Sequence, residues 1–200
     1  MSFVDVPDVF IGSTDDAHTF LVLNRPVPGA NRLLTDAGFT ARKVNGRTVY
    51  LLAPTTSEDA NEQTGIAMYG LLAHTHDLVD LSWTTRWNPQ DSGTEPDLRF
   101  TFTGTALAAS ATTPAARSLL ELHGFAPADG GGSYRPTVAL NETDVLGMVV
   151  RAEAHAHAVG IGVRVELGIP TPDAIPAPPR GPSSAVPGGP PSRPARRHTP

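Results

Sequence analysis

Two pairs of histidines have the spacing that could most readily support metal chemistry. His74 and His76 form the sequence HTH, and His155 and His157 form HAH, each near the end of a predicted helix. Four imidazoles brought together could bind zinc or another borderline metal. The alternative is that they are solvated residues at helix C-termini, where the helix dipole favours them. A metal-dependent hydrolase is therefore one hypothesis.

Acid–base chemistry has one candidate cluster, formed by His74, His76, Asp77 and Asp80. The corresponding places later in the chain hold Ala158 and Gly160, so the cluster is not duplicated. The sequence has no cysteine, no G-x-S-x-G nucleophile motif and no glycine-rich phosphate fingerprint in a strand–loop–helix context. These observations assign no catalytic residue and no cofactor, and they favour a non-enzymatic protein.

Aromatic and arginine residues between 83 and 102 suggest a second kind of site. Nucleic acid could stack on an open sheet face carrying Phe100, Phe102 and four further residues: Trp83, Arg86, Trp87 and Arg99. The alternative is that most of these aromatic side chains are core. The charge balance argues against nucleic acid as the default partner, because residues 1–168 carry −5 − 3 = −8 once the tail's +3 is removed.

The tail, residues 169–200, contains 11 of the 20 prolines and carries four arginines against one aspartate. Such a composition predicts a disordered Pro/Arg-rich segment, because it lacks the apolar side chains needed to offset the entropy of ordering. Its P-x-x-P spacings also resemble ligands of domains that bind polyproline helices, so a docking role is an open alternative.

A repeated phrase indicates how the rest of the chain is built. PGANRLLTDAGF at 28–39 and PAARSLLELHGF at 114–125 share Pro, Ala, Leu-Leu, Gly and Phe at the same spacing. Further landmarks match at offsets that fall from 89 at Pro7 and Pro96 to 80 at Asn61 and Asn141. The sequence therefore predicts two tandem α+β repeats, at 1–88 and 96–168, joined by a linker at 89–95.

Each repeat is predicted to run strand, strand, helix, strand, strand, helix, strand. Asn45-Gly46 is a strong signal for a two-residue hairpin, and Gly38 and Gly124 suit the ends of helices. The last strand of the first repeat is predicted from the alternation of Val79, Leu81 and Trp83. A mostly antiparallel sheet with both helices on one face would bury the apolar stripes, and two such units would pack about a pseudo-twofold axis.

The leading functional hypothesis is a binding or regulatory protein that acts on a protein partner, because duplication doubles an interaction surface. DNA or single-stranded nucleic-acid binding through the sheet, assisted by the basic tail, and the metal-dependent hydrolase are the alternatives. No export signal or membrane span is evident, which predicts a cytoplasmic protein. The excess of arginine over lysine suggests a bacterial gene of high GC content, compatible with an accessory protein of a mobile element.

Overall fold

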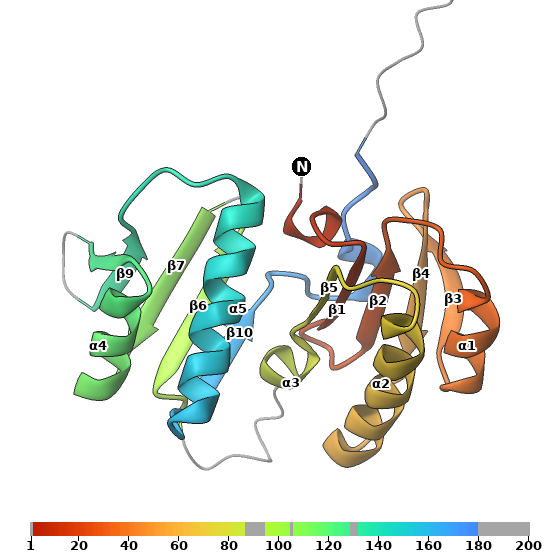
Figure 1. The fold of residues 1–200 in the computed structure, drawn as a ribbon, viewed down its shortest axis with the longest axis horizontal. Coiled ribbons are helices and arrows are strands. Elements are labelled where there is room, and N and C mark those ends of the chain that lie inside the picture. The colour runs from red at the N-terminus through yellow and green to blue at the C-terminus, as the bar shows by residue number, and fades with distance from the viewer. Residues whose placement is uncertain (1, 87–94, 105, 129–131, 180–200) are drawn as a thin grey trace, which may run out of the picture.

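The computed structural model describes residues 2–86, 95–104, 106–128 and 132–179, and within them the fold is mixed α+β (Figure 1). The first half contains a short 3₁₀ helix and eight further elements: η1 Phe3–Asp5, β1 Val9–Ser13, β2 Thr19–Leu23, α1 Ala30–Asp36, β3 Thr40–Val44, β4 Arg47–Leu52, α2 Ser57–Leu72, β5 Leu78–Asp80 and α3 Ser82–Thr85. The second half contains β6 Leu98–Thr103, β7 Ala106–Ala111, α4 Pro114–Leu122, β8 Phe125–Pro127, β9 Ser133–Pro136, α5 Glu142–Ala158, β10 Val163–Glu166 and η2 Pro172–Ala174.

Each half forms its own five-stranded sheet. The first has the order β3-β4-β2-β1-β5 and the second the order β8-β9-β7-β6-β10. Neighbouring strands are antiparallel except for β1 with β5 and β6 with β10, which are parallel. The sheets are therefore mostly antiparallel, as the sequence predicts, and each places its one parallel strand at an edge.

Local sequence signals explain where several elements begin and end. Asn45 and Gly46 both have positive φ values, 47° and 85°, and they join β3 to β4 as a two-residue hairpin. The hydroxyl of Thr56 and the side-chain oxygen of Asn141 accept hydrogen bonds from backbone N–H groups in the first turns of α2 and α5. Pro114 occupies the first turn of α4. Its predicted counterpart Pro28 instead precedes the helix, because Gly29 is the N-cap of α1.

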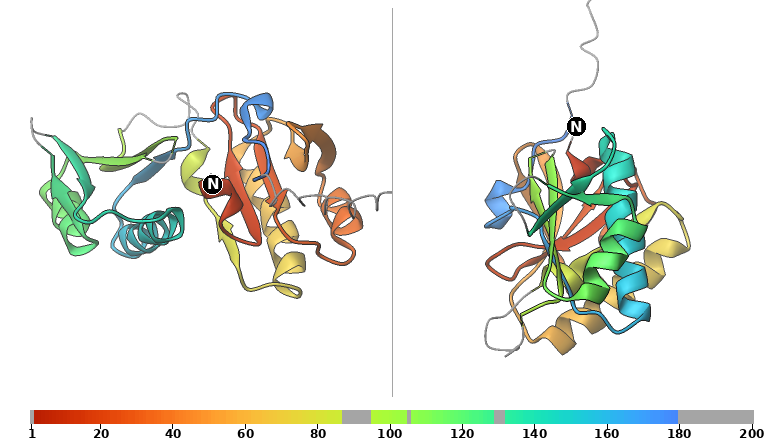
Figure 2. Two further views of the ribbon diagram at one scale, coloured as in Figure 1. Left: turned by 90° about the horizontal axis from the view of Figure 1, so that it is seen from above. Right: turned by 90° about the vertical axis from the view of Figure 1, so that its left-hand side faces the viewer.

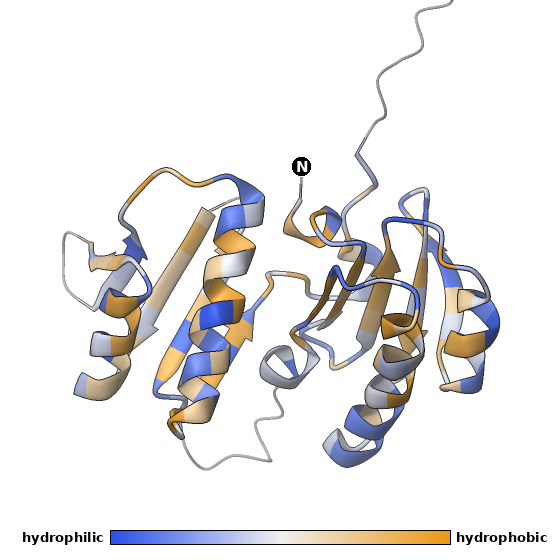
Figure 3. Ribbon diagram, viewed as in Figure 1, coloured by the Kyte–Doolittle hydropathy of each residue, from blue (hydrophilic) through white to orange (hydrophobic). Residues whose placement is uncertain are grey.

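The helices of each half lie on one side of its sheet, as the view from above shows (Figure 2, left). Apolar residues line that side of the first sheet and meet α1 and α2 in one buried cluster, which includes Ile11, Leu21, Leu34, Ala67 and Leu71. The strands are correspondingly hydrophobic, while polar residues of α2 and α5 face outward (Figure 3).

A second buried cluster runs through both halves. It contains Phe10, Phe20 and Val49 from the opposite face of the first sheet together with Phe100 and Val149 from the second half. The first sheet is therefore buried on both faces, which explains the uninterrupted burial of β1.

Phe3 in η1 joins the two sheets directly. Its ring centroid lies 4.5 Å from that of Phe102 in β6 and 5.7 Å from that of Phe10 in β1. Aromatic pairs at these separations contribute beyond their buried area. The N-terminal 3₁₀ helix thus holds the halves together.

The back of the first sheet is covered by residues 167–176, here called the C-terminal strap. Leu167, Ile169 and Ile175 are buried there. Gly12 permits the close approach, because a Cβ at that position would lie 2.8 Å from Leu167 Cδ1. The backbone N–H of Asp15 donates to the carbonyl of Ile169 at 3.0 Å. Figure 1 shows the strap in blue passing from β10 across the first half.

The strap changes the boundary predicted for the disordered tail, which the sequence placed at residue 169. Residues 169–179 are described by the structure and contain the 3₁₀ helix η2, whereas 180–200 lie outside the described residues. Side chains of the β3–β4 hairpin hold the strap: Asn45 Nδ2 donates to the carbonyls of Asp173 (2.9 Å) and Ile175 (2.8 Å). Arg42 pairs with Asp173 at 2.8 Å. This segment has few apolar residues, but it is ordered because those residues pack against the back of the first sheet.

Two details of the predicted repeat alignment are wrong. Asn61 lies inside α2, whereas Asn141 is the N-cap of α5, so the two NE dipeptides occupy different positions. The strand expected to include Trp83 ends at Asp80, because the carboxylate of Asp80 accepts a hydrogen bond from the Ser82 N–H at 2.8 Å and the chain turns into α3. Except for Glu95, the predicted linker at 89–95 lies outside the described residues.

Candidate functional site

The short helix α3 lies between the two halves and positions the most promising site. The hydroxyl of Thr85 donates to the carbonyl of Leu81 at 2.6 Å and accepts from the Ser13 N–H at 2.8 Å, which fixes α3 to the end of β1. Arg86 donates to Asn61 Oδ1 at 3.0 Å and also to the Thr19 hydroxyl. These contacts anchor α3 to the first half of the protein.

On its other side, α3 meets α5 from the second half. The Thr84 hydroxyl donates to Glu153 Oε1 at 2.6 Å, a direct bond between the halves. Between the two helices lies an open groove of about 570 Å³, here called the boundary groove. It is lined by Asp80, Trp83, Thr84, Val150, Glu153, Ala154, His157 and Ala158. Binding sites often form at such boundaries, where two units supply different walls.

The groove combines an exposed aromatic side chain with two partly buried carboxylates. Trp83 is 61% exposed although it is the largest side chain of α3. Burial, reinforced by the charge of Asp80, raises the pKa of Glu153 to about 7, with the Thr84 hydrogen bond acting in the opposite direction. Burial also raises the pKa of Asp80, against the hydrogen bond from Ser82 and the charge of Arg86. Perturbed carboxyls in a groove mark a candidate site for binding or proton transfer.

The four histidines proposed as metal ligands occupy two separate places. His74 and His76 are exposed in the loop after α2, and His155 and His157 lie in the last turn of α5. His155 Nδ1 lies 3.1 Å from Nε2 of His123, the C-cap of α4, and His157 lines the boundary groove. In the ranges that the structure describes, no three or more His, Asp or Glu side chains are grouped to hold a metal ion.

The residues proposed for nucleic-acid binding are also separated. Trp83 and Arg86 belong to the α3 region, whereas Arg99 lies in β6 beside Glu95 (3.3 Å) and Glu166 (3.5 Å). Trp87 lies outside the described residues. The rings expected to accompany them, Phe100 and Phe102, are buried in the core and pack away from solvent.

Two members of the candidate acid–base cluster, Asp77 and Asp80, accept structural hydrogen bonds from backbone N–H groups. The Asp77 carboxylate accepts a hydrogen bond from the Asp8 N–H at 3.2 Å. The hydroxyl of Thr75 donates to Asp8 Oδ2 at 2.9 Å, so the loop is tied to the start of β1. Asp80 alone among the cluster's four residues lines the boundary groove.

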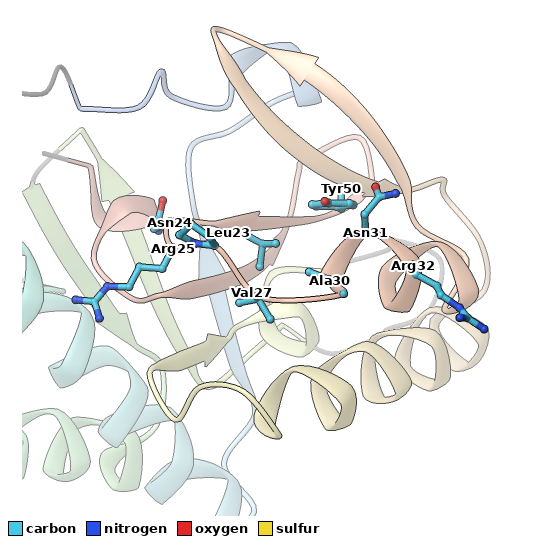
Figure 4. Close-up of a pocket in the computed structure, with 10 residues that line it drawn as sticks. Leu23, Asn24, Arg25, Val27, Ala30, Asn31, Arg32 and Tyr50 are labelled. Carbon is cyan, nitrogen blue, oxygen red and sulfur yellow. The ribbon is translucent and has the colours of Figure 1, made fainter.

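A larger depression of about 710 Å³ lies beside Tyr50 and the loop between β2 and α1 (Figure 4). Its two arginines point away from each other, toward opposite ends of the pocket. Arg25 pairs with Asp8 at 2.9 Å, and Arg32 pairs with Asp36 at 3.6 Å. Because its charged groups do not converge, this depression offers less recognition chemistry than the boundary groove.

The amino-acid sequence alone did not identify Thr84 and Glu153 as residues of a site. Glu153 did leave a signal, because it is four residues after Val149 and three before Ala156, both fully buried on the sheet-facing side of α5. A carboxylate at the edge of an apolar stripe is uncommon without a reason. No comparable signal marks Thr84. Its role depends on α3, and the alternation of Val79, Leu81 and Trp83 predicted a strand at that place.

Comparisons with family models, with curated proteins and with solved structures find no match to this chain. No helix within the described ranges combines the length and the apolar character needed to cross a membrane.

Proposed function

We propose that this chain is a non-enzymatic binding protein that recognises a protein partner, with the boundary groove at the centre of the contact. The observation that carries the proposal is the exposure of Trp83 at the rim of a groove built by both halves. Tryptophan is enriched among the residues that dominate binding energy at protein interfaces, especially beside a pocket. A single exposed apolar residue is ordinary, but the helix that carries Trp83 is anchored by the contacts of Thr85 and Arg86.

Short apolar side chains from the second half face Trp83 across the groove. Val150 and Ala154 form the α5 wall. Together with Trp83 they give a helical surface of mixed character, which is typical of interfaces that assemble reversibly.

The proposal includes an origin by duplication of one ββαββαβ module. If the strands are numbered from one within each half, both sheets have the order 3-4-2-1-5. The strand pairing also supports the match, because the two tyrosines aligned by the repeat, Tyr50 and Tyr134, each lie on the fourth strand opposite a residue of the second strand, Leu21 and Ala109. The strands β5 and β10 both face the boundary, and α2 and α5 run in opposite directions (Figure 1), which is compatible with a twofold axis perpendicular to the two helices. Each module would then supply one wall of the groove.

Nucleic-acid binding is the second candidate, favoured by one observation. Arg99 and Arg164 are adjacent across β6 and β10 on the side of the second sheet away from its helices. Both are close to Glu166, at 3.5 and 3.2 Å, so their charge is partly neutralised. The buried rings of Phe100 and Phe102 also remove the stacking platform. We therefore rank this function below protein binding.

The remaining parts of the proposal concern cellular context. We place the chain in the bacterial cytoplasm as an accessory protein of a mobile element, and its excess of arginine over lysine supports the bacterial origin. The proline- and arginine-rich tail would supply a secondary docking segment.

Affinity capture with matched variants tests the proposal. The full chain, Trp83→Ala and Leu122→Ala are each used as bait, and the captured proteins are compared by quantitative mass spectrometry. Leu122 is the control because it is 71% exposed but lies on α4, away from the groove. We expect a protein that is captured by the full chain and Leu122→Ala and is lost with Trp83→Ala. Capture that is indifferent to Trp83, or turnover of a small substrate by the purified chain, would contradict the proposal.

A further inference from the structure

Among the described residues, the two carboxylates of the boundary groove accept hydrogen bonds from neutral groups, the Ser82 N–H and the Thr84 hydroxyl, and His157 also lines the groove. The bond that the structure gives to Glu153 comes from the neutral hydroxyl of Thr84. Arg86 is the cation that acts on Asp80, but its guanidinium donates to Thr19, Asn61 and the Ser57 carbonyl, on the first-half side of α3. Two carboxylates therefore border the groove while the nearby guanidinium is engaged elsewhere.

The walls of the groove suit a long side chain with a cationic end. Val150, Ala154 and Ala158 form a short-chained surface along α5, and the exposed ring of Trp83 lies across from them on α3. Methylene groups can pack on such surfaces while the charge approaches the carboxylates. A guanidinium is better suited than an ammonium, because it forms two parallel hydrogen bonds with a carboxylate.

We propose that the boundary groove binds an arginine side chain from a basic segment of the protein partner, with the guanidinium beside Glu153 and Asp80 and its stem against Trp83. This inference rests on the proposed function and names the partner's chemistry. Charge complementarity beyond the groove supports it, because residues 1–168 carry a net charge of −8 from −5 − 3. An acidic protein surface accelerates encounter with a basic segment and disfavours acidic ones.

A library of random peptides displayed on phage provides the test without knowledge of the partner. Peptides are selected on the full chain, and those that also bind Trp83→Ala are removed. We expect the remaining peptides to be enriched in arginine. Replacing that arginine by citrulline, which keeps the shape but removes the charge, should weaken binding by about tenfold or more, the loss typical of a charge-assisted hydrogen bond.

Two variants of the protein locate the charge effect. At about pH 8, where Glu153 is ionised, Glu153→Gln should weaken binding of the selected peptides by about tenfold. Glu121→Gln makes the same change on the exposed surface of α4 and should leave affinity nearly unchanged. Unfolding is not expected to explain a loss in Glu153→Gln, because removing a partly buried charge relieves its desolvation penalty.

The outcomes separate this inference from the proposed function. If no peptide requires Trp83, both fail. If peptides require Trp83 but lack arginine, or bind Glu153→Gln as tightly as the unmodified chain, protein binding stands and the arginine site is refuted. The chain's own arginines are a competing occupant: if deleting residues 180–200 raises peptide affinity severalfold, the groove is filled from within and the partner proposal is overturned.

Discussion

Single carboxyl and guanidinium groups carry much of the chemistry at the boundary between the two halves. The raised pKa of Glu153 has a defined consequence for stability, because the folded protein holds this proton up to a pH of about 7 while the unfolded chain releases it near 4.5. The neighbouring titratable side chains are Asp80 and Arg86 on the α3 side and His157 one turn along α5. Between those two pH values, the folded state binds more protons, so stability falls as pH rises.

Glu153→Gln should therefore stabilise the protein at neutral and alkaline pH. The glutamine retains a hydrogen-bond acceptor for Thr84 but cannot ionise, so we expect a gain of about 2 kcal/mol at about pH 8 and almost none at about pH 4. Urea unfolding of both proteins at the two pH values measures the difference. A variant that is less stable at alkaline pH would show that ionised Glu153 contributes favourably.

The buried ion pair between Arg47 and Asp5 gives a second prediction at this scale. Their charged atoms are 2.8 Å apart, and the side chains are only 7% and 3% exposed. Arg47 also donates to Asn24 Oδ1 at 2.7 Å and to the Pro176 carbonyl at 3.2 Å. Arg47→Ala should cost about 3 to 5 kcal/mol, because it leaves the Asp5 carboxylate buried without its cation. Chemical unfolding checks this, and a loss below about 1 kcal/mol would contradict it.

At the scale of single elements, the C-terminal strap is the piece whose contribution is most easily isolated. Ile175 is fully buried against the first sheet, so Ile175→Ala should cost about 2 to 5 kcal/mol. Asp173→Ala in the same strap is the control, since its ion pair with Arg42 is exposed and should contribute less than about 1 kcal/mol. Thermal unfolding compares the two. Equal and small effects would mean that the strap contributes little to folding.

The elements differ in how well the amino-acid sequence predicts them. Turns and helix ends depend on local backbone chemistry, so the Asn45-Gly46 hairpin and the glycine that follows α1, Gly38, could be predicted from neighbouring residues. The strap was not predictable, because Ile169 and Ile175 are isolated among prolines and their burial depends on a sheet formed more than 100 residues earlier. Trp83 misled for a related reason: the Asp80 carboxylate ends the strand, although the apolar alternation continues past it.

Across the whole molecule, the shared core predicts that the two halves unfold together. Phe3 touches aromatic rings of both sheets, and the larger buried cluster has members from each half. Circular dichroism and tryptophan fluorescence should therefore report one coincident transition.

Phe3→Ala should lower the free energy of unfolding by about 3 to 5 kcal/mol. Hydrogen exchange provides the sharper measurement, because protection should fall in β1 and in β6 alike. Loss of protection confined to one half would show that the halves are independent.

The candidate site belongs to this same scale, which is why its residues were hard to find in the sequence. Asp80 and Glu153 are far apart in the chain; the sequence marks Asp80 only as part of a cluster with His74 and His76, and it marks Glu153 only by the apolar stripe beside it. Their relation arises only when α3 and α5 meet. Residue types alone therefore indicated a site made of histidines. The packing of the two halves instead brings two carboxylates and a tryptophan together.

The route of the strap also matters while the protein is being made. The ribosome releases the strands of the first sheet well before it releases Ile175. Phe10 and Phe20 therefore remain exposed until the strap has been synthesised. At ~5–20 residues/s, translating the stretch from residue 88 to Ile175 takes about 4 to 17 s. During that interval the nascent chain presents an uncovered apolar sheet face, a surface to which chaperones bind and through which unfinished chains aggregate.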